Sequence, residues 1–367
     1  MKKTKKGLLL VSTLVFFLFI GYQYAADNTF NNQSDENNPK GTRIKDTNDM
    51  EHVSNNNVSL NDKMERTRNE WDCVKPNEVG KIMIIMYHNI GNEESTWSRH
   101  YSNFKKDLET LYKKNYRLIS MKDFIDNNID IPAGYTPVII TFDDGLEGQF
   151  SFIRKADGIN IHPNCAVRIL ESFNEQHPDF GKKAVFYINS YPVAFGQPEF
   201  VKEKLNYLVK NGMEIGNHTY SHKNLAKITP EEIKEEIGKN IAMIKKSVPE
   251  YEVCSLALPF GGIPKNLEVV AKGNWREIKY KNKSILLVGA EPALPPNHVA
   301  FDPLKIPRIR GSERYLQKWL EYFDANPRER YVSDGDPDII TVPQDLVFQI
   351  NKHSLKGKVL RTYNRSN

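Results

Sequence analysis

From about residue 79 onward, short apolar runs rich in β-branched residues alternate with stretches of helical periodicity. Such runs are typical of strands that are buried on both faces of a sheet. Between the first two runs, Phe104, Leu108 and Leu111 share one face of an expected helix. The pattern therefore predicts an α/β domain with a largely parallel sheet. Its expected strands are 81–87, 137–142, 183–189, 214–216, 255–258 and 284–288.

A second helix is expected to begin after Thr229. Thr229 is a good N-cap, Pro230 fits the first helical position, and Glu232 completes a capping box. Apolar residues then recur on one face of this helix. They are Ile233, Ile237, Ile241 and Ile244.

Polar or turn-forming residues follow the carboxyl ends of four of the expected strands. In a barrel of parallel strands, these ends share one face, and such folds assemble their functional sites there. We therefore expect residues that are distant in sequence to meet at this face. They are His88, the pair Asp143 and Asp144, the pair His218 and His222, and the turn 259–262.

His218 and His222 are four residues apart, so in a helical turn both imidazoles would project from one side. Two histidines and one carboxylate make a three-ligand site with an open position, as catalytic zinc requires. Asp143 or Asp144 would be the third ligand, and the other would be a candidate general base. Thr219 occupies the position of the general-base glutamate in the zinc-protease helix motif, which disfavours peptide hydrolysis. The alternative is a surface turn with structural histidines.

The amino-terminal part of the chain differs in composition from the rest. Lysines precede an apolar stretch of about one membrane span, so residues 1–26 are expected to be a signal peptide or an N-terminal membrane anchor. Residues 27–76 are expected to be a disordered Asn-rich linker, and 77–365 the catalytic domain. This predicts export to the outer face of the membrane, to the cell wall or to the medium.

The charge distribution argues against a nucleic-acid-binding protein, and the cysteine spacing argues against a cysteine metal site. Lysines near the amino terminus account for much of the formal charge of +5, and no basic motif supports binding of nucleic acid. Cys73, Cys165 and Cys254 are odd in number and lack metal-ligand spacing. At most one disulfide is possible, and free thiols are expected.

The motif "TFDDG" followed by "HTYSH" resembles the polysaccharide deacetylases (NodB-like, carbohydrate esterase family 4), and the resemblance covers about residues 81–310. It implies a distorted (β/α) barrel, with Asp143 as base and Asp144, His218 and His222 as metal ligands. It also implies a divalent metal, first of all Zn²⁺, with Ni²⁺, Co²⁺ or Mn²⁺ also suited to these ligands. An N-acetylated polysaccharide would be the substrate, and a monomer is expected.

Two departures from the family pattern indicate one branch of it. Ala257 in "ALPFG" stands where the family commonly has arginine, and no late Leu-His motif supplies a general acid. The segment "IIMYHNI" is similar to the branch of biofilm poly-N-acetylglucosamine deacetylases, whose early Tyr-His motif supplies the acid. This implies His88 as general acid, although a strand end held by local hydrogen bonds is the alternative.

Two further residues complete the expected site. Arg308 in "KIPRIRG" is hypothesised to replace the absent arginine and to orient Asp143, because a guanidinium fork suits a carboxylate. The alternative for Arg308 is a surface salt bridge. A backbone N–H near Phe260 is expected to hold the oxyanion of the reaction.

These expectations predict an exported, metal-dependent deacetylase of a cell-surface or cell-wall polysaccharide. If the chain remains uncleaved, its amino-terminal segment would hold it at the membrane. Two other functions fit the same residues. One is a non-catalytic glycan-binding or wall-associated protein on the same fold, and the other is a metal enzyme for a different acyl or amide substrate.

Overall fold

The computed structural model describes residues 74–365 apart from residue 157. The expected signal peptide or anchor, most of the expected linker, and Cys73 lie outside these residues. Within the described part of the chain, no helix is both long enough and apolar enough to span a bilayer.

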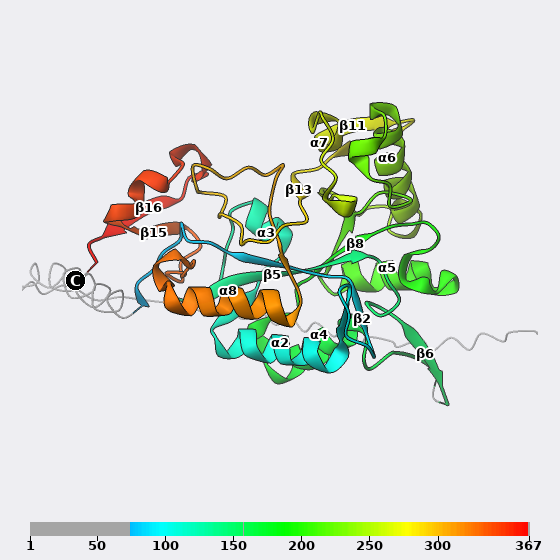
Figure 1. Ribbon diagram of the computed structural model, residues 1–367, viewed down its shortest axis with the longest axis horizontal. Helices are drawn as coiled ribbons and strands as arrows, with labels where there is room; N and C mark the ends of the chain where they lie inside the picture. The colour runs from blue at the N-terminus through cyan, green and yellow to red at the C-terminus, as the bar shows by residue number, and fades with distance from the viewer. Residues whose placement is uncertain (1–73, 157, 366–367) are drawn as a thin grey trace, which may run out of the picture. The chain divides into compact units, whose positions relative to one another are not determined.

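A curled parallel sheet lies at the centre of the described residues (Figure 1). Its order is β13-β10-β9-β8-β5-β1-β14, and β4 pairs with the first residues of β5. Every expected strand is present, so the prediction of a largely parallel sheet is confirmed. The strands are β1 Met83–Tyr87, β4 Tyr116–Leu118, β5 Thr136–Asp144, β8 Val185–Ile188, β9 Glu214–Asn217, β10 Ser255–Ala257, β13 Ser284–Leu286 and β14 Ile309–Arg310.

The segment 303–310 connects the two edges of this sheet. At its start, Ile285 of β13 donates its N–H to the carbonyl of Pro303 at 2.8 Å, and Leu287 donates to Ile306 at 2.8 Å. At its end, β14 pairs in parallel with β1. The sheet therefore curls into the distorted barrel that was expected, and Arg308, near the end of this segment, reaches Thr141 and Asp143 of β5.

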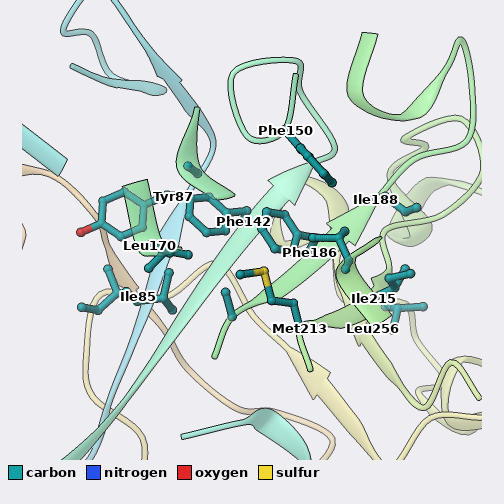
Figure 2. Packing of buried hydrophobic residues seen from close by; sticks show 14 of the residues in the cluster. Ile85, Tyr87, Phe142, Phe150, Leu170, Phe186, Ile188, Met213, Ile215 and Leu256 are labelled. Carbon is teal, nitrogen blue, oxygen red and sulfur yellow. The ribbon is translucent and has the colours of Figure 1, made fainter. Parts of the chain in front are cut away.

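All but one of the helices cover the outer face of the curled sheet, and their apolar residues form one large core with that face. The exception is the helix Met121–Ile125, whose Met121 and Phe124 belong to the inner cluster. Successive residues alternate between two clusters, since Ile85 faces the helices and Ile84 faces the barrel interior. Figure 2 shows part of the outer cluster, where the rings of Phe142 and Phe186 stack at 4.9 Å. The helices are α2 Tyr101–Lys113, α3 Met121–Ile125, α4 Ala166–Gln176, α5 Val201–Lys210, α6 Pro230–Ser247, α7 Glu268–Ala271 and α8 Glu313–Ala325.

Helix α6 begins as the sequence predicts. Thr229 accepts from the N–H of Glu232 at 3.3 Å, and the Glu232 carboxylate accepts from the N–H of Thr229 at 2.9 Å. This reciprocal pair is a capping box, and it fixes the first turn of α6. The helix packs its isoleucine face into the outer core.

Shorter elements surround the barrel. The strand pairs are β2 Asn89–Gly91 with β3 Ser98–His100, β6 Phe152–Lys155 with β7 Gly158–Ile161, β11 Lys272–Trp275 with β12 Ile278–Lys281, and β15 Ile339–Pro343 with β16 Val359–Tyr363. Short 3-10 helices are η1 Pro178–Phe180, η2 Ala194–Gly196, η3 Pro198–Phe200, η4 Leu225–Lys227, η5 Pro259–Gly261, η6 Pro327–Glu329, η7 Gln344–Gln349 and η8 Lys352–Ser354.

Candidate active site

Asp143, the next-to-last residue of β5, forms a buried ion pair with Arg308. The guanidinium Nη1 lies 2.7 Å from Oδ1 of Asp143, and Nη2 lies 2.7 Å from Oδ2. The exposed fraction of the aspartate is 1% and that of the arginine is 0%. The structure therefore places Arg308 on Asp143 in a bidentate contact and not at the surface.

Two further N–H groups of Arg308 also have acceptors. Its Nη1 donates to the hydroxyl of Thr141 at 3.1 Å, and its Nε donates to the carbonyl of Leu287 at 3.0 Å. Burial alone would raise the pKa of Asp143, but the guanidinium outweighs it and holds this pKa well below its ordinary value. Asp143 is therefore an ionised, fixed carboxylate with two acceptor positions that Arg308 does not use.

Asp144 ends β5 with a positive φ of 78°, and its carboxylate meets the two histidines. Its Oδ1 lies 3.3 Å from Nε2 of His218 and 3.2 Å from Nε2 of His222. These three side chains form a group of the size that holds one metal ion. The structure thus brings together Asp144, His218 and His222, which the family resemblance had assigned to the metal.

The two histidines lie on a loop and not on a helical turn. His218 directly follows β9, and the chain then continues as a loop in which Thr219 and His222 have φ values of 68° and 57°. This left-handed backbone is unfavourable for residues other than glycine, so the surrounding contacts must hold it. The loop nevertheless directs both imidazoles at Asp144.

The protonation state of these side chains favours the binding of a cation between them. Nδ1 of His218 lies 2.9 Å from the carbonyl of Ala257, which can only accept, so this nitrogen carries the proton and Nε2 of the neutral ring does not. Oδ1 of Asp144 is buried and lacks a hydrogen-bond partner among the described residues. Lone pairs therefore face one another across 3.3 Å, and a divalent cation between them would satisfy both.

The pKa values of two of these groups agree with this role. Burial, followed by the neighbouring His218, lowers the pKa of His222, so its neutral form is available to bind a metal. Burial would raise the pKa of Asp144, but positive charge at His218, whose place a bound cation would take, lowers this pKa below its ordinary value. Both of these side chains therefore suit the binding of a cation.

A network of buried asparagines holds the histidine loop. The Asn217 side chain accepts from the N–H of Thr219 at 2.8 Å and from Nδ2 of Asn240 at 3.0 Å. Asn189 donates from Nδ2 to the carbonyls of His218 and Thr219. Sequence reasoning missed these three residues, and the only signal was that Asn217 directly precedes His218 at a strand end.

His88 directly follows β1. Burial lowers its pKa, while the charges of Asp143 and Asp144 raise it in part. Its ring packs against that of Trp97 with centroids 4.6 Å apart. Gln149 donates from Nε2 to the carbonyls of both His88 and Asp143, so it connects the ends of β1 and β5.

Phe260 lies beside the histidines on the turn η5. Its ring centroid is 4.5 Å from that of His222, and 67% of the residue is exposed. It occupies the second position of the 3-10 turn, where a backbone N–H has no partner within the helix. Tyr191, which is 59% exposed, adds a second aromatic face close to Tyr220.

Two residues noted in the sequence have other roles in the structure. Ala257 is buried in the inner core, and only its carbonyl serves the site, through His218. The described cysteines Cys165 and Cys254 are free thiols.

Residues 131–275 match the family model described as polysaccharide deacetylase. This range contains β5, β8, β9 and β10, and therefore Asp143, Asp144, His218 and His222. His88 and Arg308 lie outside it.

Three solved structures resemble this chain. The deacetylase PplD of Streptococcus pyogenes matches with a TM-score of 0.50 and 19% identity over 66% of this chain and 97% of that one. A polysaccharide deacetylase from Bacillus cereus has a TM-score of 0.48 and 18% identity, over 66% and 68% of the two chains. IcaB from Ammonifex degensii has a TM-score of 0.48 and 16% identity, over 66% and 97%.

At 19% identity, the first of these structures shows a common fold alone, and that fold is the NodB-type barrel. The assignment of chemistry comes from the family match over residues 131–275. This match covers less than half of the chain, and it supports a hydrolase that acts on carbon–nitrogen bonds other than peptide bonds.

Proposed function

We propose that this chain is an exported, metal-dependent deacetylase that releases acetate from N-acetyl groups of a cell-surface or cell-wall polysaccharide. One observation carries the proposal. The partnerless Oδ1 of Asp144 faces two imidazole nitrogens, directly beside an aspartate that Arg308 keeps ionised. This is a cation site with a neighbouring base.

Asp144, His218 and His222 would hold the cation, first of all Zn²⁺. When bound, the cation would polarise the acetamide carbonyl and bring the pKa of a water towards neutrality. Three protein ligands leave an open position, as a catalytic site needs. The hydrogen bond from His218 to the Ala257 carbonyl orients that ring for binding.

Asp143 would accept the proton of the attacking water. Two of its acceptor positions are held by Arg308, and the others remain for water. Its low pKa keeps the carboxylate ionised throughout the working pH range. Arg308 therefore acts as a positioning residue that replaces the family arginine absent at Ala257.

His88 would protonate the departing sugar amine, because it follows the end of β1, which Gln149 joins to the end of β5 at Asp143. The N–H of Phe260 would donate to the oxyanion that develops on the acetamide oxygen. These assignments support a place in the branch with an early Tyr-His motif. The exposed rings of Phe260 and Tyr191 offer apolar faces to sugar rings.

Two further observations support the proposed product and location. The S. pyogenes deacetylase was solved in complex with acetate, which is the product expected here. The apolar segment within residues 1–26 supports export, with the chain either anchored at the membrane or released.

Acetate release from a panel of N-acetylated glycans tests the proposal. The zinc-loaded protein should release acetate from N-acetylglucosamine oligomers or from peptidoglycan, and both Asp143→Asn and a chelator should stop the release. Release that survives both treatments would refute the mechanism. Bound metal without acetate release from any glycan would instead select the non-catalytic glycan-binding function.

A further inference from the structure

A second hollow lies far from the candidate active site. It has a volume of about 250 Å³, and its wall includes the cationic residues Lys75, Arg328, Arg330 and Arg365. Val332 and the ring of Tyr363 add apolar surface. The basic cavity, as we call it, lies where the start of the described chain meets η6 and β16.

The positive charge of the basic cavity is largely uncompensated within the described residues. Counting the carboxylates of the described residues, only Arg365 of the four cations contacts one, that of Asp345 at 3.5 Å. Nearby carboxylates are bound elsewhere, since Glu329 pairs with Lys81 at 2.7 Å and Asp324 pairs with Lys114 at 2.5 Å. The Nε of Arg330 is buried without a hydrogen-bond partner. Like charges gathered around one hollow attract an anion.

The side chains that line the basic cavity favour phosphate over other anions. Arginine forks suit the oxygens of phosphate, and several arginines together favour phosphate over a single carboxylate. The volume lies just below the range for drug-sized ligands, so a small molecule would fill the cavity. Its apolar part would suit a short carbon skeleton. We propose that the basic cavity binds a small phosphate ester, for which glycerol 3-phosphate serves as the probe.

The basic cavity is separate from the catalytic site. Lys81 pairs with Arg330 just before β1 begins, whereas His88 follows the end of β1. Seven residues of extended chain span about 23 Å. In Figure 1, β15 and β16 accordingly lie near the amino end of β1, away from β2. Binding at the cavity therefore does not depend on the proposed catalytic function.

Isothermal titration of the full chain in neutral detergent with glycerol 3-phosphate tests the proposal. We expect saturable binding that weakens with salt, and no binding of glycerol. Arg328→Gln combined with Arg330→Gln should weaken binding by roughly tenfold or more, because it removes two charged donors. Lys279→Gln combined with Lys281→Gln, on the exposed side of β12, should leave binding within about twofold.

Arg328→Gln alone is the safer variant, since that side chain is exposed and its loss should not disturb folding. Like the double variant, it should weaken the binding of glycerol 3-phosphate. Acetate release from a glycan should stay unchanged. Absence of glycerol phosphate binding to the wild type would overturn the proposal. Equal binding by the wild type and both arginine variants would overturn it as well.

The phosphate could belong to a lipid headgroup or to a soluble or wall-borne ester. The full chain in nanodiscs of neutral lipid should bind glycerol phosphate in either case. If the headgroup is the ligand, phosphatidylglycerol in the disc should compete with the soluble ligand, and Arg328→Gln should abolish the competition. Binding that is equal in both discs would assign the site to a non-lipid phosphate ester.

Discussion

Arg308 and Asp143 lie 165 positions apart in sequence and meet through two contacts of 2.7 Å in the barrel interior. A buried ion pair is costly to break from one side, because the remaining charge is left without a partner. The pair therefore serves both the fold and the proposed base. These two contributions can be separated by substitution.

We predict that Arg308→Met lowers the free energy of unfolding by about 3–5 kcal/mol. It should also lower kcat at least a hundredfold, because burial then raises the pKa of Asp143 and protonates the base. The double variant Arg308→Met with Asp143→Asn should recover much of the stability and none of the activity. Denaturant titration and acetate release measure the two effects.

Arg310, which lies two residues after Arg308 at the end of β14, provides the matched control. Its guanidinium packs on Trp97 and not on Asp143. Arg310→Met should therefore leave the free energy of unfolding within about 1 kcal/mol of the wild type. A similar loss of stability in both arginine variants would contradict the special role of the Arg308 pair.

His88 gives a prediction about pH. A general acid must be protonated, so the alkaline limb of kcat reports its pKa. Burial beside Trp97 lowers that pKa, and Trp97→Ala exposes the ring to water. The pKa should then rise towards its ordinary value, and the alkaline limb should move to higher pH.

Trp97→Phe keeps an aromatic ring over His88 and should leave the limb near its wild-type position. The pH dependence of kcat, measured at saturating glycan, separates this effect from weaker substrate binding. An alkaline limb that moves to lower pH in Trp97→Ala, or that persists in His88→Ala, would remove His88 from the role of general acid.

At the scale of elements, the histidine loop depends on α6 and β9. Asn240 of α6 donates to Asn217 at 3.0 Å and to the carbonyl of Ile188 at 2.8 Å, and Asn217 in turn holds Thr219. These contacts maintain the left-handed backbone of the loop. Metal affinity should therefore depend on a residue that touches no metal.

We predict that Asn240→Ala weakens zinc affinity by about 10–100-fold, the usual effect of losing a residue that orients metal ligands. Thr229→Ala is the matched control on the same helix, since it removes the capping box and should cost about 1 kcal/mol of stability without changing zinc affinity. Competition with a chromophoric chelator measures the affinity. Equal zinc affinities in both variants would show that loop positioning does not matter.

Sequence reasoning succeeded where the signal was local. The six strands follow from apolar runs, and the start of α6 follows from Thr229 and Glu232. It failed for the loop between His218 and His222, whose positive φ values depend on distant asparagines. Asn240 carries no local mark of its role, because its partners come from β9 and the end of β8.

The site as a whole could be assembled from sequence only through the resemblance to a known family. Spacing alone left open which aspartate binds the metal. The structure adds that Asp144 faces both imidazoles while Asp143 faces Arg308. The roles of these residues in catalysis stay predictions for the experiments above.

At the scale of the molecule, metal binding should be coupled to stability. A cation that binds only the folded chain adds about 2.7 kcal/mol at a concentration one hundred times its Kd. We predict that zinc raises the free energy of unfolding of the wild type by this amount and does not raise that of His222→Ala. Thermal unfolding with and without a chelator checks the coupling, and an equal gain in His222→Ala would place the metal elsewhere.

The central claim is that one cation is held by Asp144, His218 and His222 beside the free base Asp143. A crystal of the zinc-loaded protein, measured at the zinc absorption edge, tests it most directly. The account predicts an anomalous peak about 2.0–2.2 Å from Oδ1 of Asp144 and from Nε2 of both histidines, with Asp143 still on Arg308. A peak bound to Asp143, or no peak at these side chains, would contradict the account.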